Sequence, residues 1–284
     1  MTSPAITSDR DYRRLIDLIR AESGIEFPPT KRVMIETRLG KRARALGLSS
    51  LAAYCEYLHA GEKGREEILE LIDAVTTHKT DFFREPGHFT YLTRQALPEL
   101  ARLCGAGIRQ PLNVWSGASS TGEEPYTIAM VLAEHTKSVE PQKFRFRIEA
   151  TDISTLVLET AALGIYRSAL ADAIPKALRP KYLMRSKDRE MGRIRIVPWL
   201  RATVRFRQLN LLDADYGFRE ALDVVFCRNV MIYFDRSAQP RILRRIIRTL
   251  RYGGYLIMGH AESLNGMDLP LEQAAPTVYR RADA

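Results

Sequence analysis

The stretch VWSGASSTGEEPYTIA, residues 114–129, decides how this sequence folds. It starts as a short β-rich run, turns between Gly117 and Gly122, and continues as a helical stretch from Glu123. Three more β-rich runs alternate with helical stretches, and they lie at 144–152, 223–229 and 255–262. Alternating strands and helices predict a parallel sheet with helices on both faces, whose ligands bind at the carboxyl ends of the strands.

The segments before this pattern and within it differ from it in their predicted secondary structure. Residues 1–76 read as short amphipathic helices with Gly and Pro between them and no strand pattern, which predicts a small all-α domain. Between Asp152 and Asn210 the connection is too long for a simple crossover, and 192–208 has the pattern of a hairpin. We also expect a linker at 77–90 and an α/β domain at 91–284, which contains a small antiparallel β insertion at about 180–208.

Length and composition limit the class of protein. The chain has 284 residues, 45% hydrophobic and 27% charged, which is typical of globular proteins and disfavours disorder. No apolar run approaches the ~18 residues of a membrane-spanning helix, so we expect a cytoplasmic protein without membrane insertion. The net charge of +9 favours an acidic partner: nucleic acid, an anionic membrane surface or an acidic protein.

The cysteines and histidines show no metal-binding pattern. Cys55, Cys104 and Cys227 are widely separated and form no C-x-x-C pair, which fits a reducing compartment. The five histidines are scattered and form no H-E-x-x-H motif. We therefore expect no metal. A monomer is also expected, because no exposed apolar helix stands out as an interface.

The glycine turn indicates a nucleoside ligand without phosphates. Gly117 and Gly122 let the backbone turn sharply and approach a ligand closely. The pattern is not G-x-G-x-x-G, however, and Glu123 and Glu124 open the helix, where their charges would repel a pyrophosphate. S-adenosylmethionine fits better, because it carries a sulfonium, an ammonium and a ribose. Asp152, which ends the second strand, is placed either to accept hydrogen bonds from ribose hydroxyls or to cap the next helix.

Several longer strings resemble one family. They are KRVMIETRLGKRARALGL (31–48), TTHKTDFFRE (76–85), WSGASSTGEEPYTIA (115–129), ATDIS (150–154), LETAALGIYR (158–167), NLL (210–212) and FCRNVMIYFD (226–235). In this order they resemble the chemotaxis-receptor methyltransferase family, CheR. The resemblance implies a Rossmann-like, S-adenosylmethionine-dependent α/β domain preceded by an all-α substrate-recognition domain. It also implies a protein-glutamate O-methyltransferase, which forms glutamate methyl esters on the cytoplasmic helical region of chemoreceptors and releases S-adenosylhomocysteine.

The resemblance implies a set of cofactor-binding residues. Thr80 and Arg84 would reach the methionine end from the linker, and the Arg84 guanidinium matches a carboxylate geometrically. Several family members have Asn where this chain has His78, so the geometry and pH response of that contact are expected to differ. Glu123 would pair with the amino group and Asp152 with the ribose. The remaining implied contacts are Asn210 and Leu211 at the adenine, and Arg228 and Asn229 in the pocket wall.

The chemistry needs no general base. A glutamate carboxylate is already ionised at neutral pH and attacks the methyl carbon in line with the departing sulfur, so positioning and exclusion of water would supply the catalysis. Tyr233 is a candidate for orienting the substrate carboxylate, although it is equally well explained as a packed aromatic residue.

A basic helix face is the expected substrate site. In the helix that starts near Thr30, four cations fall on one arc beside an apolar arc: Lys31, Arg38, Lys41 and Arg42. The resemblance implies that this face recognises the acidic methylation region of receptors. In some family members the β insertion also grips a receptor C-terminal peptide by strand addition, and the turn at 186–192 leaves this open here.

Two other functions fit the residues in part. A nucleic-acid methyltransferase would use the same fold and charge, but this chain has CRNVMIYF where an N/D-P-P-Y/F motif is expected, and Cys227 follows Phe226 rather than a proline. A noncatalytic S-adenosylmethionine-binding sensor is the second alternative. The intact set of implied cofactor residues disfavours it.

Overall fold

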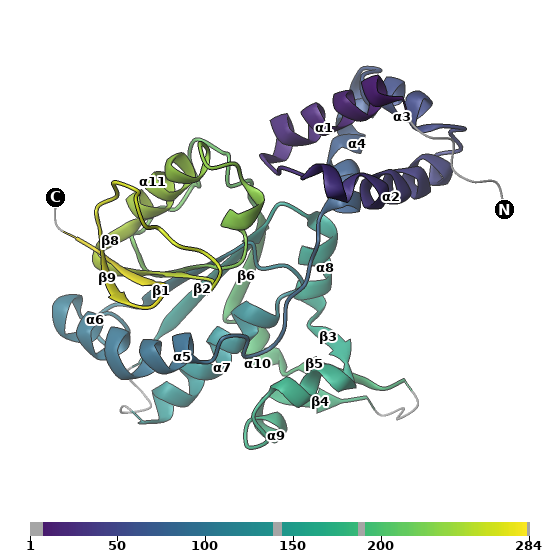
Figure 1. The fold of residues 1–284 in the computed structure, drawn as a ribbon. Helices are drawn as coiled ribbons and strands as arrows, with labels where there is room; N and C mark the ends of the chain where they lie inside the picture. Colours follow the sequence, from purple (N-terminus) through teal and green to yellow (C-terminus); the bar gives the residue numbers. More distant parts are fainter. Residues whose placement is uncertain (1–7, 139–143, 187–190, 283–284) are drawn as a thin grey trace. The chain divides into compact units, whose positions relative to one another are not determined.

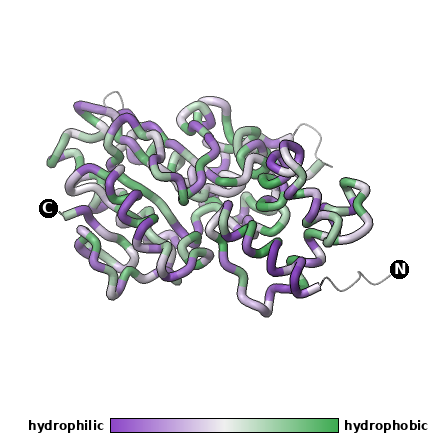
Figure 2. The backbone as a smooth tube through the Cα atoms, turned by 90° about the horizontal axis from the view of Figure 1, so that it is seen from above, coloured by the Kyte–Doolittle hydropathy of each residue, from purple (hydrophilic) through white to green (hydrophobic). Residues whose placement is uncertain are grey.

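The computed structural model describes residues 8–138, 144–186 and 191–282, which form two compact units (Figure 1). The helical unit comprises residues up to Thr77 together with Tyr233–Ala238, and the α/β unit comprises His78–Ile232 and Gln239 onward. Along the chain, hydrophilic and hydrophobic stretches alternate at short intervals (Figure 2), as expected of amphipathic elements that each bury one side.

The helical unit confirms the predicted all-α domain. Its elements are α1 (Asp9–Ser23), η1 (Pro29–Lys31), α2 (Arg32–Ala45), α3 (Leu51–Leu58) and α4 (Glu62–Val75). Helix α1 starts where the Ser8 side chain accepts a hydrogen bond from the Asp11 N–H, and it ends at Gly24, whose φ is 72°. The inward faces form one core that includes Leu15, Ile35 and Tyr54.

A segment distant in sequence completes the helical unit. Ile25 forms an antiparallel bridge with Phe234, and the Glu26 N–H donates to the Tyr233 carbonyl at 2.8 Å. Residues 233–238 begin at the last residue of the short helical turn η4 (Met231–Tyr233) and belong to this unit although their neighbours in sequence do not.

The α/β unit is built on a seven-stranded sheet within the described residues, in the order β6-β2-β1-β7-β8-β10-β9. The strands are β1 (Leu112–Gly117), β2 (Phe146–Asp152), β6 (Val204–Gln208), β7 (Leu222–Cys227), β8 (Leu250–Met258), β9 (Leu271–Ala275) and β10 (Val278–Arg281). The first five pair in parallel, as predicted, whereas β10 pairs antiparallel with β8 and β9. The sheet is therefore mixed, and its last two strands were not expected from the sequence.

Helices cover both faces of this sheet. They are α5 (Gly87–Tyr91), η2 (Leu92–Ala96), α6 (Leu97–Cys104), α7 (Glu123–Ser138), α8 (Thr155–Leu163) and α11 (Gln239–Thr249). Figure 1 shows α11 on one side of the sheet and α6 and α7 on the other. The π-helical turn η2 precedes Pro98, which lacks the N–H that would bond to the Arg94 carbonyl in a regular helix.

The β insertion is real, but its predicted form was wrong. A small antiparallel sheet has the order β3-β5-β4, with β3 (Ile165–Arg167), β4 (Leu183–Arg185) and β5 (Arg193–Ile196). The expected hairpin at 192–208 does not form. Pro198 starts the short helix α10 (Pro198–Arg201) after β5, and β6 then joins the main sheet beside β2. The small sheet thus spans 165–196, together with the turn η3 (Ser168–Ala173) and the helix α9 (Arg179–Tyr182).

Candidate cofactor and substrate sites

The carboxyl ends of five parallel strands form one edge of the α/β unit, which we call the carboxyl edge. Because β6, β2, β1, β7 and β8 are neighbours in register, the residues that follow them lie together. This edge holds the glycine turn after β1, Asp152 at the end of β2, Asn210 after β6 and Arg228 after β7. The topology therefore brings together the cofactor-binding residues predicted at these strand ends.

The glycine turn between β1 and α7 is held in an unusual backbone conformation. Ala118 and Ser120 have φ values of 57° and 49°, in the left-handed region that non-glycine residues seldom adopt. Gly122 has φ 95°, and a Cβ there would lie 2.8 Å from the Ala161 Cβ, so a larger residue would clash with α8. The turn is anchored to β2, because the Ser120 N–H donates to Asp152 Oδ2 at 2.8 Å.

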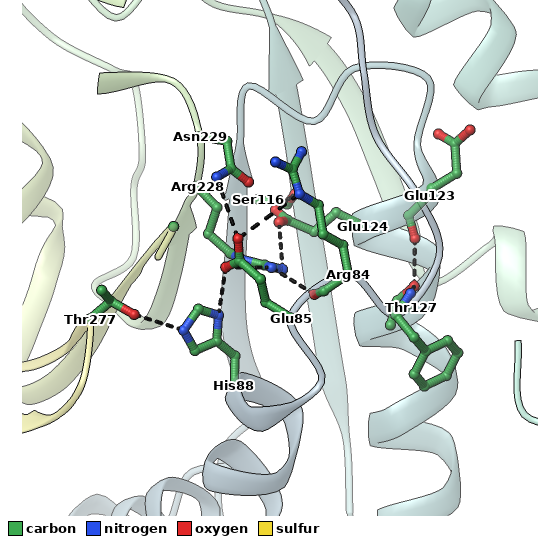
Figure 3. A network of polar contacts seen from close by, with 12 residues as sticks. Arg84, Glu85, His88, Ser116, Glu123, Glu124, Thr127, Arg228, Asn229 and Thr277 are labelled. Atoms are coloured by element: carbon green, nitrogen blue, oxygen red, sulfur yellow. Dashed lines mark hydrogen bonds and ion pairs between the residues drawn. The ribbon is translucent and has the colours of Figure 1, made fainter. Parts of the chain in front are cut away.

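The two glutamates that open α7 point in different directions (Figure 3). Glu123 is 4% exposed, and its Oε2 accepts from the Thr121 hydroxyl at 2.7 Å; no cation contacts this carboxylate in the described parts of the chain. Burial raises the pKa of Glu123. Glu124 instead points toward Arg228, and its Oε1 accepts from the Ser116 hydroxyl at 2.8 Å. Burial also raises the pKa of Glu124, although the Arg228 charge opposes that rise.

Asp152 anchors its surroundings, but it does not cap α8. Its Oδ1 accepts from the Ser154 N–H at 3.0 Å, and the cap of α8 is the Ser154 side chain, which accepts from Val157 N–H. Burial raises the pKa of Asp152, whereas the backbone hydrogen bonds and the nearby His78 lower it. The backbone carbonyl of His78 accepts from the Ser120 hydroxyl at 3.2 Å, so the start of the linker touches the glycine turn.

The residues after β6 lie beside Asp152. The Leu209 N–H donates to the Asp152 carbonyl at 3.0 Å, which places the following two residues at the same edge. The Asn210 Oδ1 accepts from the Leu212 N–H at 2.9 Å, and Leu211 is buried. The side chain of Asn210 therefore fixes its own turn.

The linker segment carries Thr80 and Arg84, and its backbone is strained. Thr80 is half-buried, and the Arg84 side chain is 37% exposed, with Nη1 donating to the Lys79 carbonyl at 3.2 Å. Phe83 and Glu85, on either side of Arg84, have φ values of 54° and 57°. The Phe83 N–H donates to the Thr127 hydroxyl at 3.1 Å, which ties this segment to α7.

Arg228 lies inside the unit rather than on an open wall. Its side chain is only 2% exposed and donates to Glu85 Oε2, Glu124 Oε2 and the Arg84 carbonyl (Figure 3). The pKa of Glu85 is lowered, because the hydrogen bond and charge of Arg228 outweigh the effect of burial. The next residue, Asn229, has a φ of 59°, and its Nδ2 donates to Glu85 Oε1 at 3.4 Å.

Glu262 is a residue of this edge that sequence reasoning missed. Its buried carboxylate accepts four backbone N–H bonds at 2.7 Å, from Asn229, Val230, Met231 and Gly259. It thereby joins the ends of β7 and β8. The signal in the sequence was an acidic residue at the end of the β-rich run 255–262, four residues after the last residue of β8.

One group of side chains at this edge could hold a metal ion. Glu85, His88 and His260 offer ligand atoms that lie within 4.8 Å of one another. His88 is buried, which lowers its pKa to about 4, and its Nε2 lies 2.9 Å from the Thr277 hydroxyl. Glu85 already has a cationic partner in Arg228 at 2.9 Å, so we assign no metal, and its absence stays a prediction.

The basic face of α2 is only partly free. Arg42 forms two hydrogen bonds of 2.7 Å to Glu67, and Arg38 Nη1 donates to the Val75 and Thr76 carbonyls at the end of α4. These two guanidiniums therefore hold α2 against α4. The cations on the exposed side are the predicted Lys31 and Lys41 together with Arg44, which was not predicted.

Tyr233 groups with the helical unit. Its backbone carbonyl accepts from the Glu26 N–H, and its side chain is half-buried. The turn at 186–192, on which peptide binding was left open, includes residues 187–190, which lie outside the described part of the chain.

The residues of the carboxyl edge fit S-adenosylmethionine. Glu123 is a buried carboxylate that accepts a hydrogen bond from the Thr121 hydroxyl and that no cation contacts among the described residues, so an ammonium group would supply the missing positive charge. The exposed part of Arg84 offers a guanidinium for a carboxylate, and the acidic start of α7 disfavours phosphate ligands. This donor set matches the amino-acid end of the cofactor.

Comparisons with known proteins agree with this assignment. Residues 10–76 match the model of the CheR methyltransferase all-alpha domain, and residues 78–279 match the CheR methyltransferase SAM binding domain. A chemotaxis protein methyltransferase of Escherichia coli is 39% identical, covering 98% of this chain and 93% of that protein. Chemotaxis protein methyltransferase 2 of Pseudomonas aeruginosa is 37% identical, covering 96% and 93%. The chain therefore belongs to the CheR methyltransferase family.

Proposed function

We propose that this protein methylates glutamate side chains on the cytoplasmic helical region of chemoreceptors, with S-adenosylmethionine as methyl donor and S-adenosylhomocysteine as product. As a CheR methyltransferase, the chain is an S-adenosylmethionine-dependent enzyme of chemotaxis. The observation that carries the proposal is the buried Glu123 carboxylate at the carboxyl edge, which no cation contacts in the described part of the chain. We place the reaction in the cytoplasm, where the receptor helices lie.

In this proposal the cofactor contacts are divided along the edge. His78, Thr80 and Arg84 contact the methionine end, and Glu123 pairs with its amino group. The ribose is bound by Asp152, with Asn210 and Leu211 beside the adenine. Asn229 contributes to the wall of the site. The proximity of these residues in the α/β unit supports the assignment.

The substrate carboxylate is the nucleophile. S-adenosylmethionine supplies an activated methyl group, and the protein orients both reactants and excludes water, without a general base. Tyr233 remains the candidate for orienting the substrate carboxylate. Its hydroxyl donates a hydrogen bond to the carboxylate in this role, so Tyr233→Phe is expected to lower kcat without changing cofactor affinity.

The receptor is bound through exposed positive charge on the helical unit. Since Arg38 and Arg42 are engaged with α4, we assign the contacts with acidic receptor helices to Lys31, Lys41 and Arg44. Lys41→Glu with Arg44→Glu is expected to raise the apparent KM for receptor at least tenfold and to leave the cofactor Kd unchanged. Equal loss of cofactor binding would refute this assignment.

The small sheet offers edge strands for a receptor C-terminal peptide. Both β3 and β4 lie at the outside of the order β3-β5-β4, so either has free backbone groups for strand addition within the described residues. Titration with a peptide that ends in the receptor C-terminus tests this, and a scrambled peptide of the same composition is the control. The proposal further includes that the enzyme is a monomer and that it binds no nucleic acid. The described residues contain no helix long and apolar enough to cross a membrane.

The deciding experiment follows a labelled methyl group. The enzyme is incubated with labelled S-adenosylmethionine and chemoreceptor-containing membranes, beside a nucleic-acid control, and the product is treated with mild alkali. Release of the label from receptor as methanol is expected for a carboxyl methyl ester. Label on nucleic acid, or alkali-stable label on protein, would refute glutamate methylation. Binding of cofactor without any transfer would favour the noncatalytic sensor.

A further inference from the structure

The Arg228 guanidinium reaches three protein acceptors through its two terminal nitrogens, while its buried Nε has no hydrogen-bond partner among the described residues. It donates to the Arg84 carbonyl at 2.6 Å, to Glu85 Oε2 at 2.9 Å and to Glu124 Oε2 at 3.1 Å. The Phe89 ring lies beside it, 5.7 Å from the guanidinium carbon. With its side chain 2% exposed, Arg228 has no open face toward a ligand. Its influence on the reaction must therefore pass through the groups it holds.

The group that it holds is the strained part of the linker. Phe83 and Glu85 both have positive φ values, and such conformations persist in non-glycine residues only where the surroundings fix them. At the start of this segment, the Thr127 hydroxyl accepts a hydrogen bond from the Phe83 N–H. At its end, Arg228 donates to the Arg84 carbonyl and to the Glu85 carboxylate. The Arg84 side chain leaves the backbone between these two anchors (Figure 3).

The contacts of Arg228 with the linker require a guanidinium group. This one group lies between two carboxylates, Glu85 and Glu124, that come from different segments of the chain. An arginine can contact both carboxylates and the carbonyl at once through its fixed fork of N–H groups. A lysine keeps the charge but is a point donor on a flexible stem, so it would satisfy this arrangement only in part.

We propose that Arg228 is a positioning residue, which clamps the segment Phe83–Glu85 so that Arg84 is held in place to bind the cofactor carboxylate. Arg228 thus acts through Arg84 rather than as a wall of the cofactor site. This inference rests on the proposed cofactor role of Arg84.

The test compares two arginines that pair with buried carboxylates near opposite ends of β7. Arg228 follows the strand, whereas Asp223 near the start of β7 pairs with Arg251 of β8, whose side chain is 19% exposed. Arg228→Lys and Arg251→Lys therefore both weaken an ion pair to a largely buried carboxylate, but only Arg228 contacts the linker. Measurements are the Kd for S-adenosylhomocysteine by calorimetry, kcat and KM, and hydrogen exchange of amides in 83–88.

Arg228→Lys is expected to weaken S-adenosylhomocysteine binding about 100-fold, the scale of a misplaced positioning group, and to speed exchange in 83–88. Arg251→Lys should change neither S-adenosylhomocysteine binding nor exchange in 83–88, even if it lowers the melting temperature as much as Arg228→Lys does. Equal changes in both variants, or unchanged binding in Arg228→Lys, would overturn the proposal. Should Arg228→Lys not fold, Glu124→Gln takes its place, with a weakening of about tenfold expected.

A further variant separates this inference from the proposed function. Arg84→Met should lose S-adenosylhomocysteine affinity without faster exchange at its neighbours. Suppose that the native protein and Arg228→Lys bind the cofactor equally well and that Arg84→Met does not bind it. The positioning role of Arg228 is then refuted, while the cofactor role of Arg84 stands. If the native protein does not bind the cofactor, the proposed function itself fails.

Discussion

Replacing Glu262 by Gln should destabilise the α/β unit strongly while barely changing its shape. One carboxylate oxygen accepts the N–H groups of Val230 and Met231, and the other accepts those of Asn229 and Gly259. An amide keeps one accepting oxygen but turns an NH₂ group toward the other pair. Two N–H groups, one buried and one partly buried, then lose their acceptor at about 1–3 kcal/mol each, which predicts a loss of about 2–6 kcal/mol.

The two tryptophans of the chain make this loss measurable in one unit. Trp115 and Trp199 both lie in the α/β unit, so urea unfolding followed by tryptophan fluorescence reports that unit alone. Far-ultraviolet circular dichroism follows both units and shows whether the helical unit unfolds separately. Glu272→Gln, at an exposed position of β9, is the matched control and should change the free energy of unfolding by less than about 0.5 kcal/mol.

A loss below about 1 kcal/mol for Glu262→Gln would refute the reasoning, because it would mean that the four backbone donors do not depend on the carboxylate. A loss as large in Glu272→Gln would refute it as well, since that side chain is exposed.

Three more predictions concern other parts of the chain. Arg42→Met leaves the buried Glu67 without its ion-pair partner, so the helical unit should lose about 3–5 kcal/mol in circular dichroism unfolding while tryptophan fluorescence is unchanged. Gly259→Ala places a Cβ 2.3 Å from Asn229 Nδ2 and 2.9 Å from its backbone nitrogen, so the α/β unit should lose about 1–3 kcal/mol in urea unfolding. The pKa of Glu134 is lowered to about 2, because hydrogen bonds from Lys137, Lys181 and Tyr182 outweigh burial; its stabilisation should be complete above pH 4.5 and disappear toward pH 2. The difference in unfolding free energy between the native protein and Glu134→Gln, measured across this range, checks the sign.

The sequence predicted the elements well where pattern alone decides them. The strand, glycine turn and helix around Gly122 have a periodicity that no partner has to supply, and the parallel order placed Asp152 and Arg228 at one edge. The hairpin at 192–208 failed because both strands carry a β pattern, and the pattern does not say which sheet each will join. Pro198 was the local sign that the two runs are separate.

The contacts of charged side chains were the part that could not be predicted. The family resemblance assigned Arg38 and Arg42 to the substrate and Arg228 to the wall of the cofactor site, and a helix or strand position does not tell which acceptor a side chain reaches. Their acceptors come from residues far away in sequence: the end of α4, Glu67 on α4, and Glu85 and Glu124. Only the tertiary fold brings these groups together. Whether the remaining site residues bind cofactor stays a prediction.

The bridge between Ile25 and Phe234 has a consequence for synthesis on the ribosome. The four helices of the helical unit are translated by residue 77, but residues 233–238 of the same unit follow only after most of the α/β unit. At 5–20 residues per second, the first helices wait about 8–30 s for their last segment. A fragment that ends at residue 77 therefore lacks part of its own unit, and Ile25 loses its strand partner. We expect such a fragment to be less stable than one to which the 233–238 peptide is added.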